Sequence, residues 1–231
     1  PSKVADAKMK MYNLDGSEGK MCGNGIRCVG KFLYDHGMVD INEKDEITIE
    51  TLSGIKKLKA YTSGGKVNRL RVDMGKAILD PKEIPVVLDG DKVVDRPVEI
   101  AGKNYNITCV SMGNPHCVVF MDDIDNLDIE TVGPEFENDK LFPERVNTEF
   151  VTVLDDHTIK MRVWERGSGE TWACGTGACA VAVAACENGF CKKGEDIKIK
   201  LKGGDLIINY TDETVYMTGN AEKVFEGEVE V

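Results

Sequence analysis

Residues 174–189 read CGTGACAVAVAACENG, and this stretch decides the fold class. After the Cys-Gly-Thr-Gly opening, every position from Ala178 to Ala185 carries a small or apolar side chain. A helix without a polar face is buried on every side, and a glycine such as Gly189 is a common stop signal for a helix. We therefore predict a buried helix over Gly175–Asn188. In a strand-rich chain, a curved sheet is the natural surrounding for it.

A second stretch, residues 22–37, repeats the arrangement as CGNGIRCVGKFLYDHG. A Gly-Ser pair lies upstream of each cysteine, and the interval from cysteine to closing glycine is equal, since 37 − 22 = 15 and 189 − 174 = 15. Apolar residues at helical spacing predict a helix over Gly23–His36. Two Gly-rich helix starts can coincide by chance, but the shared cysteine, Gly-Ser pair and length favour two related domains.

Short segments rich in strand-forming residues fill most of the remaining chain, and Gly- and Asp-rich turns separate them. Such short connections favour antiparallel hairpins over crossover helices. The predicted strands are Lys8–Leu14, Ile47–Thr51, Ile55–Tyr61, Leu70–Met74, Tyr105–Val110, Cys117–Phe120, Glu149–Leu154, Ile159–Trp164, Ile197–Leu201, Leu206–Tyr210, Val215–Thr218 and Val224–Val231.

These patterns predict an α/β (α+β) fold with two pseudo-symmetric domains. Each domain is expected to hold a curved, mostly antiparallel, β-barrel-like sheet around a central helix. The predicted N-terminal domain comprises residues 1–74 with 221–231, and the C-terminal domain comprises residues 75–220.

Composition limits the classes of function. The 231 residues include 29 Lys and Arg against 40 Asp and Glu, a net charge of −11, which argues against a nucleic-acid or anionic-membrane partner. The apolar runs are too short to span a bilayer, and with no export signal we expect a cytoplasmic protein whose eight cysteines are free thiols. No Cys-x-x-Cys pair occurs and the three histidines are scattered, so we expect no metal site. The oligomeric state stays open, with a homodimer among the candidates.

The two cysteine-led helix starts suggest a chemistry. The first N–H groups of a helix have no intrahelical partner, and the helix dipole lowers the pKa of a cysteine placed there. Flanking glycines let these N–H groups approach an anion such as a carboxylate. Two such ends would hold one carboxylate and place a sulfur on each side of the adjacent carbon. A single cysteine at a helix start is more often a small buried residue, but the duplication favours inversion of an α-carbon without a cofactor.

Four motifs, in order along the chain, resemble the diaminopimelate epimerase family. They are NLDGSE (13–18) with MCGNGIRC (21–28), SMGNPH (111–116), RVNT (145–148), and WERGSGET (164–171) with ACGTGAC (173–179). Any one of them is a weak signal, whereas the ordered set is specific. The resemblance implies a cofactor-independent isomerase that interconverts LL- and meso-diaminopimelate in lysine biosynthesis, with an amino acid as its small-molecule substrate.

The resemblance also implies roles for individual residues. Cys22 and Cys174 match the two catalytic cysteines, which exchange acid and base roles with the direction of reaction. Residues matching the substrate-binding groups fall into three sets: Gly23, Asn24, Gly175 and Thr176 for the reacting carboxylate; Asn13, Asn114, Asn147 and Arg166 for the distal end; and Glu165 and His116 beside the cysteines and the substrate ammonium. The other cysteines and both tryptophans are expected to serve packing.

One departure from the family lies at the N-terminus, where the chain opens at Pro1. The family's opening strands are expected to be absent from this sequence, and Lys223–Val231 would be a strand that returns to the first domain.

Three alternatives stay open. A related proline or hydroxyproline racemase is disfavoured by Asn24, where that group is expected to have histidine. A thiol hydrolase using Cys174 with His116 leaves Cys22 unexplained. A truncated, inactive member acting as a binding module is the third.

Overall fold

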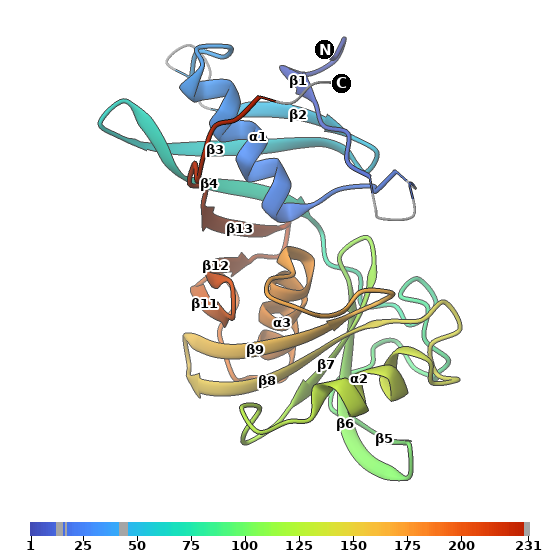
Figure 1. The fold of residues 1–231 in the computed structure, drawn as a ribbon. Coiled ribbons are helices and arrows are strands. Elements are labelled where there is room, and N and C mark those ends of the chain that lie inside the picture. The colour runs from blue at the N-terminus through green and yellow to red at the C-terminus, as the bar shows by residue number, and fades with distance from the viewer. Residues whose placement is uncertain (13–15, 17, 42–45, 229–231) are drawn as a thin grey trace. The chain divides into compact units, whose positions relative to one another are not determined.

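The computed structural model describes residues 1–12, 16, 18–41 and 46–228. The chain forms two compact units (Figure 1). Unit 1 comprises Pro1–Val72 with Thr218–Val231, and unit 2 comprises Asp73–Met217. Unit 1 is therefore built from both ends of the chain. The domain boundaries stated above stay a prediction.

Unit 1 is a small sheet with one helix. Its strands lie in the order β1-β2-β3-β4, and β1 runs parallel to β2 while the other pairs are antiparallel. The bounds are β1 (Ala7–Lys8), β2 (Ile47–Thr51), β3 (Gly54–Ser63) and β4 (Lys66–Gly75), whose last residues lie in unit 2. Helix α1 (Gly23–Asp35) packs on β2 and β3 and buries Ile26 and Leu33 (Figure 1).

Unit 2 holds most of the sheet. Its strands lie in the order β13-β12-β11-β9-β8-β7-β6-β5, with β10 paired to β9. The pairs β7–β8 and β9–β11 are parallel, whereas β5–β6, β6–β7, β8–β9, β9–β10 and β11–β12 are antiparallel. The bounds are β5 (Arg96–Ile100), β6 (Lys103–Ser111), β7 (Pro115–Phe120), β8 (Asn147–Asp155), β9 (Thr158–Glu165), β10 (Gly169–Thr171), β11 (Asp196–Leu201), β12 (Gly204–Tyr210) and β13 (Val215–Asn220), which ends in unit 1.

Helix α3 (Gly175–Glu187) is the core of unit 2. Residues Ala178 to Ala185 have no exposed surface, and the helix packs against β6, β7, β8, β11 and β12 (Figure 1). The curved sheet supplies apolar contacts around a helix that has no polar face. The sequence prediction of a buried helix wrapped by a sheet is confirmed. The predicted fold class is also confirmed, as a sheet that curves without closing.

A third helix was missed by the sequence prediction. Helix α2 (Ile129–Glu137) begins at Asp128, whose carboxylate accepts a hydrogen bond from the Thr131 N–H at 3.4 Å. It is short, and Gly133 and Pro134 interrupt its helical pattern. Its buried face joins Phe136 to a cluster with Phe150 and Ile107 of the sheet, so tertiary packing stabilises it more than propensity does.

Several other expectations differ from the structure. The predicted strand Lys8–Leu14 differs from β1, which covers Ala7–Lys8, and residues 13–14 lie outside the described part of the chain. The strands β5 and β10 were not predicted. Residues 223–228, expected as a returning strand, form neither strand nor helix, and residues 229–231 lie outside the described part of the chain. Cys28 and Trp172 were expected in packing, but Cys28 is exposed and the Trp172 side chain is 74% exposed.

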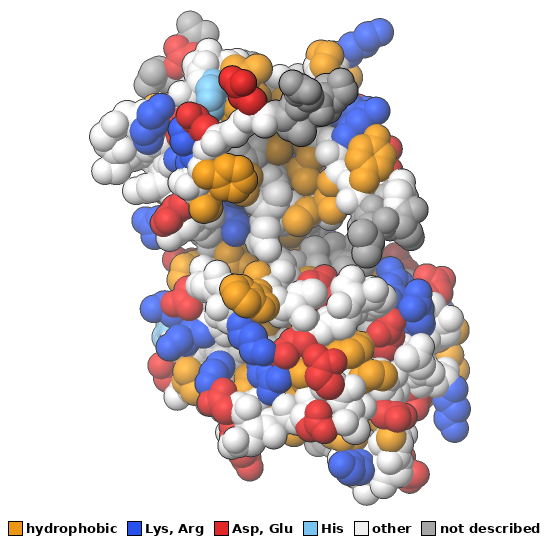
Figure 2. All heavy atoms as spheres, viewed as in Figure 1, with side chains coloured by type: hydrophobic (Ala, Val, Ile, Leu, Met, Phe, Trp, Pro, Cys, Tyr) orange, Lys and Arg blue, Asp and Glu red, His pale blue; other side chains and the backbone are white. Residues whose placement is uncertain are grey.

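Surface charges of both signs are interspersed on the face of unit 2 seen in Figure 2. Lys193 and Asp212 of unit 2 form one exposed pair, 3.0 Å apart. Pairs of this kind contribute about 0–1 kcal/mol each because water screens them. The fold therefore depends on its buried sheet and helices rather than on surface ion pairs.

Candidate active site

Cys22 and Cys174 occupy equivalent places at the starts of α1 and α3. Each is the residue before the helix with extended backbone, at φ −130° and ψ 118° for Cys22 and φ −121° and ψ 111° for Cys174. Each sulfur accepts a hydrogen bond at 3.4 Å from the N–H three residues on, that of Gly25 or Gly177. Each helix has 13 residues. The duplication seen in the sequence is therefore a duplication of backbone geometry.

The two helices also end alike. Gly37 follows α1 at φ 66°, and Gly189 follows α3 at φ 77°. These left-handed conformations favour glycine because a side chain there is strained. The equal spacing from cysteine to glycine reflects helices of equal length.

Cys174 is nearly buried, at 6% exposure. Burial raises its pKa well above the usual range, and the negative charges of Glu165 and Glu149 act in the same direction. The hydrogen bonds from Thr176 and the Gly177 N–H favour the thiolate but are outweighed. The prediction that a helix start lowers the cysteine pKa is therefore wrong for Cys174, because desolvation and two carboxylates oppose the helix dipole.

A chain of hydrogen bonds connects the polar residues of unit 2 to Cys174. His116 Nδ1 lies 2.7 Å from Glu149 Oε1, and His116 Nε2 lies 3.1 Å from Asn114 Oδ1. The Asn114 amide donates to Thr176 Oγ1 at 3.4 Å, and Thr176 Oγ1 lies 3.5 Å from Cys174 Sγ. The structure thus brings together four residues singled out from the sequence: Asn114, His116, Cys174 and Thr176.

Asn147, Arg166 and Glu165 form a second group in unit 2. The Asn147 side chain accepts from the Arg166 N–H at 3.0 Å and donates to the Pro115 carbonyl at 2.8 Å. It therefore joins the β9–β10 turn to the segment between Asn114 and His116. The guanidinium of Arg166 donates to the Glu144 carbonyl at 2.8 Å, and Thr171 donates to the Glu165 carboxylate.

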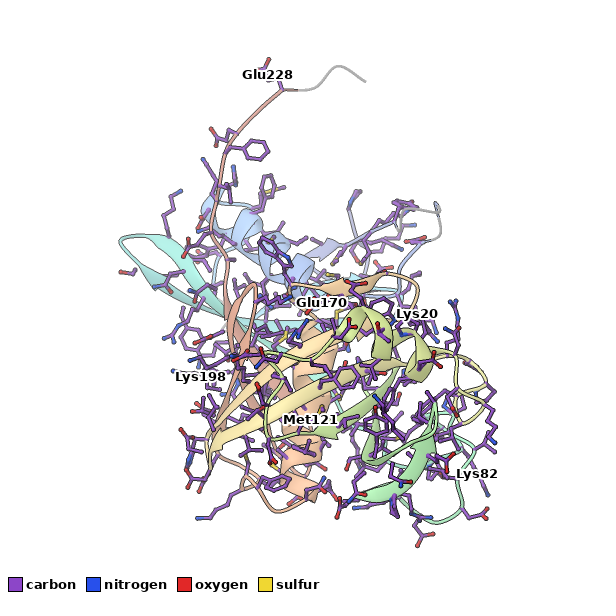
Figure 3. The ribbon with its side chains drawn as sticks, turned by 60° about the horizontal axis from the view of Figure 1, so that its bottom comes forward. Lys20, Lys82, Met121, Glu170, Lys198 and Glu228 are labelled. Atoms are coloured by element: carbon purple, nitrogen blue, oxygen red, sulfur yellow. The ribbon has the colours of Figure 1, made fainter. Side chains whose placement is uncertain are left out.

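Glu170, labelled in Figure 3, holds the β9–β10 hairpin that carries this group. Its Oε1 accepts from Arg162 Nε at 2.8 Å and lies 2.7 Å from Lys202 Nζ. Burial alone would raise the pKa of Glu170, but the hydrogen bonds and charges of the two cations lower it. The hairpin is therefore fixed by a carboxylate that stays ionised.

The sequence prediction missed two glutamates that hydrogen-bond to residues in or next to the site. Glu149 is fully buried, and burial raises its pKa although His116 opposes the shift. Glu137, at the end of α2, accepts from Trp164 Nε1 at 2.7 Å, from the Gly167 N–H at 2.9 Å and from Arg145 at 3.0 Å. The sequence did offer a signal for Glu149, because it is an acidic residue next to Phe150 in a predicted strand of mainly apolar residues. Glu137 gave no comparable signal, because α2 itself was not predicted.

In unit 1, Arg27 supports the start of α1. It is 7% exposed, and its guanidinium donates to the Gly23 carbonyl at 3.0 Å and the Asn220 carbonyl at 3.2 Å. Gly23 is buried and Asn24 half-buried beside it. Asn13 lies outside the described residues.

The described residues offer one carboxylate and histidine cluster of a size suited to a metal: Asp155, Asp156 and His157, all exposed at the β8–β9 turn. His157 already pairs with Asp156 at 2.7 Å and with Glu195 at 2.8 Å. No helix in the described part of the chain has the length and hydropathy needed to cross a membrane.

Solved structures share the fold. A probable proline racemase from Agrobacterium radiobacter superposes with a TM-score of 0.73 at 17% identity, over 95% of this chain and 71% of that one. A PhzF-family phenazine biosynthesis protein from Bacillus anthracis has a TM-score of 0.64 at 19% identity, over 100% of this chain and 82% of that one. At such identities the likeness establishes the architecture alone.

Sequence comparison is more specific. The profile described as diaminopimelate epimerase matches residues 1–79 and 108–224. The diaminopimelate epimerase of Agathobacter rectalis is 52% identical over 240 residues, covering 100% of this chain and 82% of that protein. That of Methanococcus maripaludis is 52% identical over 233 residues, with the same coverage. With matches of this identity over the whole chain, the protein belongs to the diaminopimelate epimerase family of isomerases.

Proposed function

We propose that this protein interconverts LL- and meso-diaminopimelate by removing and returning the α-proton, without a cofactor, as a step of lysine biosynthesis. The observation that carries the proposal is the shared geometry of Cys22 and Cys174. Each sulfur caps a helix and accepts one N–H at 3.4 Å. Two equivalent sulfurs match a reaction in which one group takes a proton and a like group gives one.

The helix starts would bind the carboxylate next to the reacting carbon. Removal of the α-proton adds negative charge to that carboxylate in the transition state. The first backbone N–H groups of α1, at Gly23 and Asn24, and of α3, at Gly175 and Thr176, are suited to stabilise this charge. Such preorganised donors stabilise a transition state because they need no reorganisation as the charge forms.

The thiol of Cys174 would be the resting proton donor. Burial and the charges of Glu165 and Glu149 raise its pKa, so the sulfur keeps its proton in the unliganded protein. Cys22 then takes the α-proton, and Cys174 delivers its proton to the carbon. After one turnover Cys22 carries a proton and Cys174 has lost its own. In the reverse direction the two sulfurs therefore exchange roles.

The distal amino-acid end would bind to the second group of polar residues. Arg166 can pair with a carboxylate in two parallel hydrogen bonds. Asn114 and Asn147 offer both donors and acceptors, which suits a zwitterion. Glu165 supplies an anion for an ammonium. Asn13 completes this proposed set.

A thiol hydrolase is less well supported. Such an enzyme needs its histidine hydrogen-bonded to the nucleophile. The two ring nitrogens of His116 are within hydrogen-bond distance of Glu149 and Asn114, and the sulfur of Cys174 is held by Gly177 and Thr176. The solved structure of the proline racemase supports the architecture of this chain, but it carries no argument about the substrate of this chain.

We further propose that units 1 and 2 correspond to the two domains predicted from sequence, and that the protein works in the cytoplasm. An amino acid is the expected small-molecule partner. A homodimer remains a prediction to be checked by sedimentation.

The test is α-deuterium incorporation from D₂O into LL-diaminopimelate, together with formation of the meso isomer. We expect both in the unchanged protein and loss of interconversion in Cys22→Ala and in Cys174→Ala. Cys28→Ala is the matched control because Cys28 is exposed on the same helix as Cys22. Exchange that persists in both active-site variants would contradict the two-base assignment.

A further inference from the structure

Glu149 is a buried carboxylate that the proposed reaction does not use directly. Glu149, on β8, and His116, on β7, both have 0% exposure, and Oε1 of the glutamate lies 2.7 Å from Nδ1 of the histidine. Its other oxygen, Oε2, has no hydrogen-bond partner within the described residues. A buried ionisable pair is costly to desolvate, and apolar residues of equal volume often replace such a pair without loss of stability. A gain in stability is therefore a weak explanation for this pair.

The neighbours of His116 define which ring nitrogen carries a proton. Asn114 Oδ1 lies 3.1 Å from Nε2, and a carbonyl oxygen can only accept. With the Asn114 amide in this orientation, Nε2 carries a proton. Nδ1 then shares its hydrogen bond with Glu149, whether the proton sits on the ring or on the carboxyl group. Burial raises the pKa of Glu149 and so favours the neutral pair, in which its carboxyl group donates to Nδ1 and the ring keeps its proton on Nε2.

This arrangement orients the next two side chains. With its oxygen toward His116, the amide of Asn114 turns its NH₂ group toward Thr176 Oγ1, 3.4 Å away. Thr176 accepts that hydrogen bond and can donate its own O–H to Cys174 Sγ at 3.5 Å. The hydrogen bonds therefore run in one direction, from His116 to Cys174.

Glu149 also touches the start of α3 directly. A Cβ added to Gly177 would lie 2.6 Å from Glu149 Oε1, so this oxygen lies close to the backbone whose N–H caps Cys174. The same oxygen meets both His116 and the first turn of the helix. Glycine at this position allows that close approach.

We propose that Glu149 is a positioning residue that acts through His116, fixing the imidazole with a proton on Nε2 and so orienting Asn114 and Thr176 toward Cys174. It touches neither the substrate nor the reacting sulfur. The expected effect on kcat rests on the proposed epimerase function. The expected effect on the His116 ring rests on the hydrogen-bond geometry.

The test compares Glu149→Gln with Thr152→Val. Glutamine keeps the volume and can either donate to or accept from Nδ1, so the imidazole is no longer held in one form. Thr152 is the control, because it lies on the same strand and its buried hydroxyl has no hydrogen-bond partner in the described part of the chain. Misplaced groups of this kind lower rates by about 100-fold. We expect kcat for diaminopimelate to fall by about that factor in Glu149→Gln with KM little changed, and Thr152→Val to match the unchanged protein.

The direct readout is ¹⁵N NMR of the histidine ring nitrogens. The protein has three histidines, so replacing His36 and His157 by Gln leaves the His116 signals alone. We expect Nε2–H as a single species in this background and a mixture of tautomers when Glu149→Gln is added. Unchanged kcat in Glu149→Gln, or a single unchanged tautomer, would overturn the proposal.

Two further outcomes are decisive. Should Glu149→Gln fail to fold, the spectrum of the parent background decides, because a His116 ring with unprotonated Nε2 refutes the assignment. Should the unchanged protein fail to epimerise diaminopimelate, the proposed function is wrong, while the NMR experiment still tests the role of Glu149 in fixing His116.

Discussion

At the scale of single residues, Cys174 shows how opposing effects set a thiol pKa. The helix start and the Gly177 N–H favour the thiolate, whereas burial and the carboxylates of Glu165 and Glu149 favour the thiol. The pKa of Cys174 is raised as a result, so the thiol is the favoured form. The sulfur thereby keeps its proton at a position where a helix dipole alone would favour the thiolate.

The Glu165→Gln substitution tests this balance. Removing a negative charge near the sulfur makes the thiolate less unfavourable, so the pKa of Cys174 should fall and its alkylation by iodoacetamide should begin at lower pH. Mass spectrometry of the Cys174 peptide across a pH series measures the change. Glu135→Gln, an exposed change on α2, should leave the profile unaltered. A profile that is equal in all three proteins contradicts the electrostatic account.

At the scale of elements, α1 and α3 share their ends but not their surroundings. Helix α3 is surrounded by strands of unit 2, whereas α1 packs on β2, β3 and β4 and leaves Phe32 54% exposed. Gly30 sets how closely α1 approaches its sheet. A Cβ there would lie 2.6 Å from Leu70 Cδ2 and 2.8 Å from Leu58 Cδ2.

We expect Gly30→Ala to destabilise the protein by about 1–3 kcal/mol, the usual cost of overpacking a core. The gain in helix propensity, about 1 kcal/mol, opposes this effect without cancelling it. Urea unfolding followed by circular dichroism measures the difference. Cys28→Ala, at an exposed position of the same helix, should change stability little. Stability equal to or above that of the unchanged protein would show that the two leucines move aside.

Helix α2 positions the β9–β10 turn through Glu137. This carboxylate accepts from Trp164 Nε1 and from the Gly167 N–H, next to Arg166. Glutamine at position 137 can satisfy only one of the two donors with its oxygen. We expect Glu137→Gln to cost about 1 kcal/mol, the low end of the penalty for an unsatisfied donor, because both hydrogen bonds are only partly buried.

The same variant should raise KM for diaminopimelate more than it lowers kcat, since Arg166 is proposed to bind the distal end rather than the reacting carbon. Steady-state kinetics beside a denaturation curve separate the two effects. A stable Glu137→Gln protein with unchanged KM would mean that the turn is fixed by other contacts.

At the scale of the whole molecule, the structure predicts the reactivity of its thiols. All eight cysteines are free, and five are buried. Cys28 is exposed and Cys22 half-buried, whereas burial raises the pKa of the half-buried Cys186 to about 12. At neutral pH a thiol of that kind is almost wholly protonated and reacts slowly.

We therefore expect rapid labelling of the native protein at Cys28 and Cys22, and labelling of eight thiols once the protein is unfolded. Alkylation in the presence and absence of denaturant, followed by peptide mass spectrometry, measures both populations. Fast labelling of Cys174 or Cys179 in the native protein would contradict the burial of α3.

The sequence by itself determined the two equivalent helices, their starts at Gly23 and Gly175, and the sheet that buries α3. These features depend on local causes: capping within a few residues, apolar periodicity, and glycine where φ is positive. The family motifs added the candidate residues, because each motif lies within one short segment.

Only the tertiary structure decided the partner of His116, the direction of the Cys174 pKa and the role of α2. Glu149 meets His116 across the β7–β8 pairing although 33 residues separate them in the chain. The pKa depends on how completely water is excluded, which no local pattern encodes. Glu137 supports a turn that is distant in sequence. Such effects arise from contacts between distant segments, so they exist only once the sheet has formed.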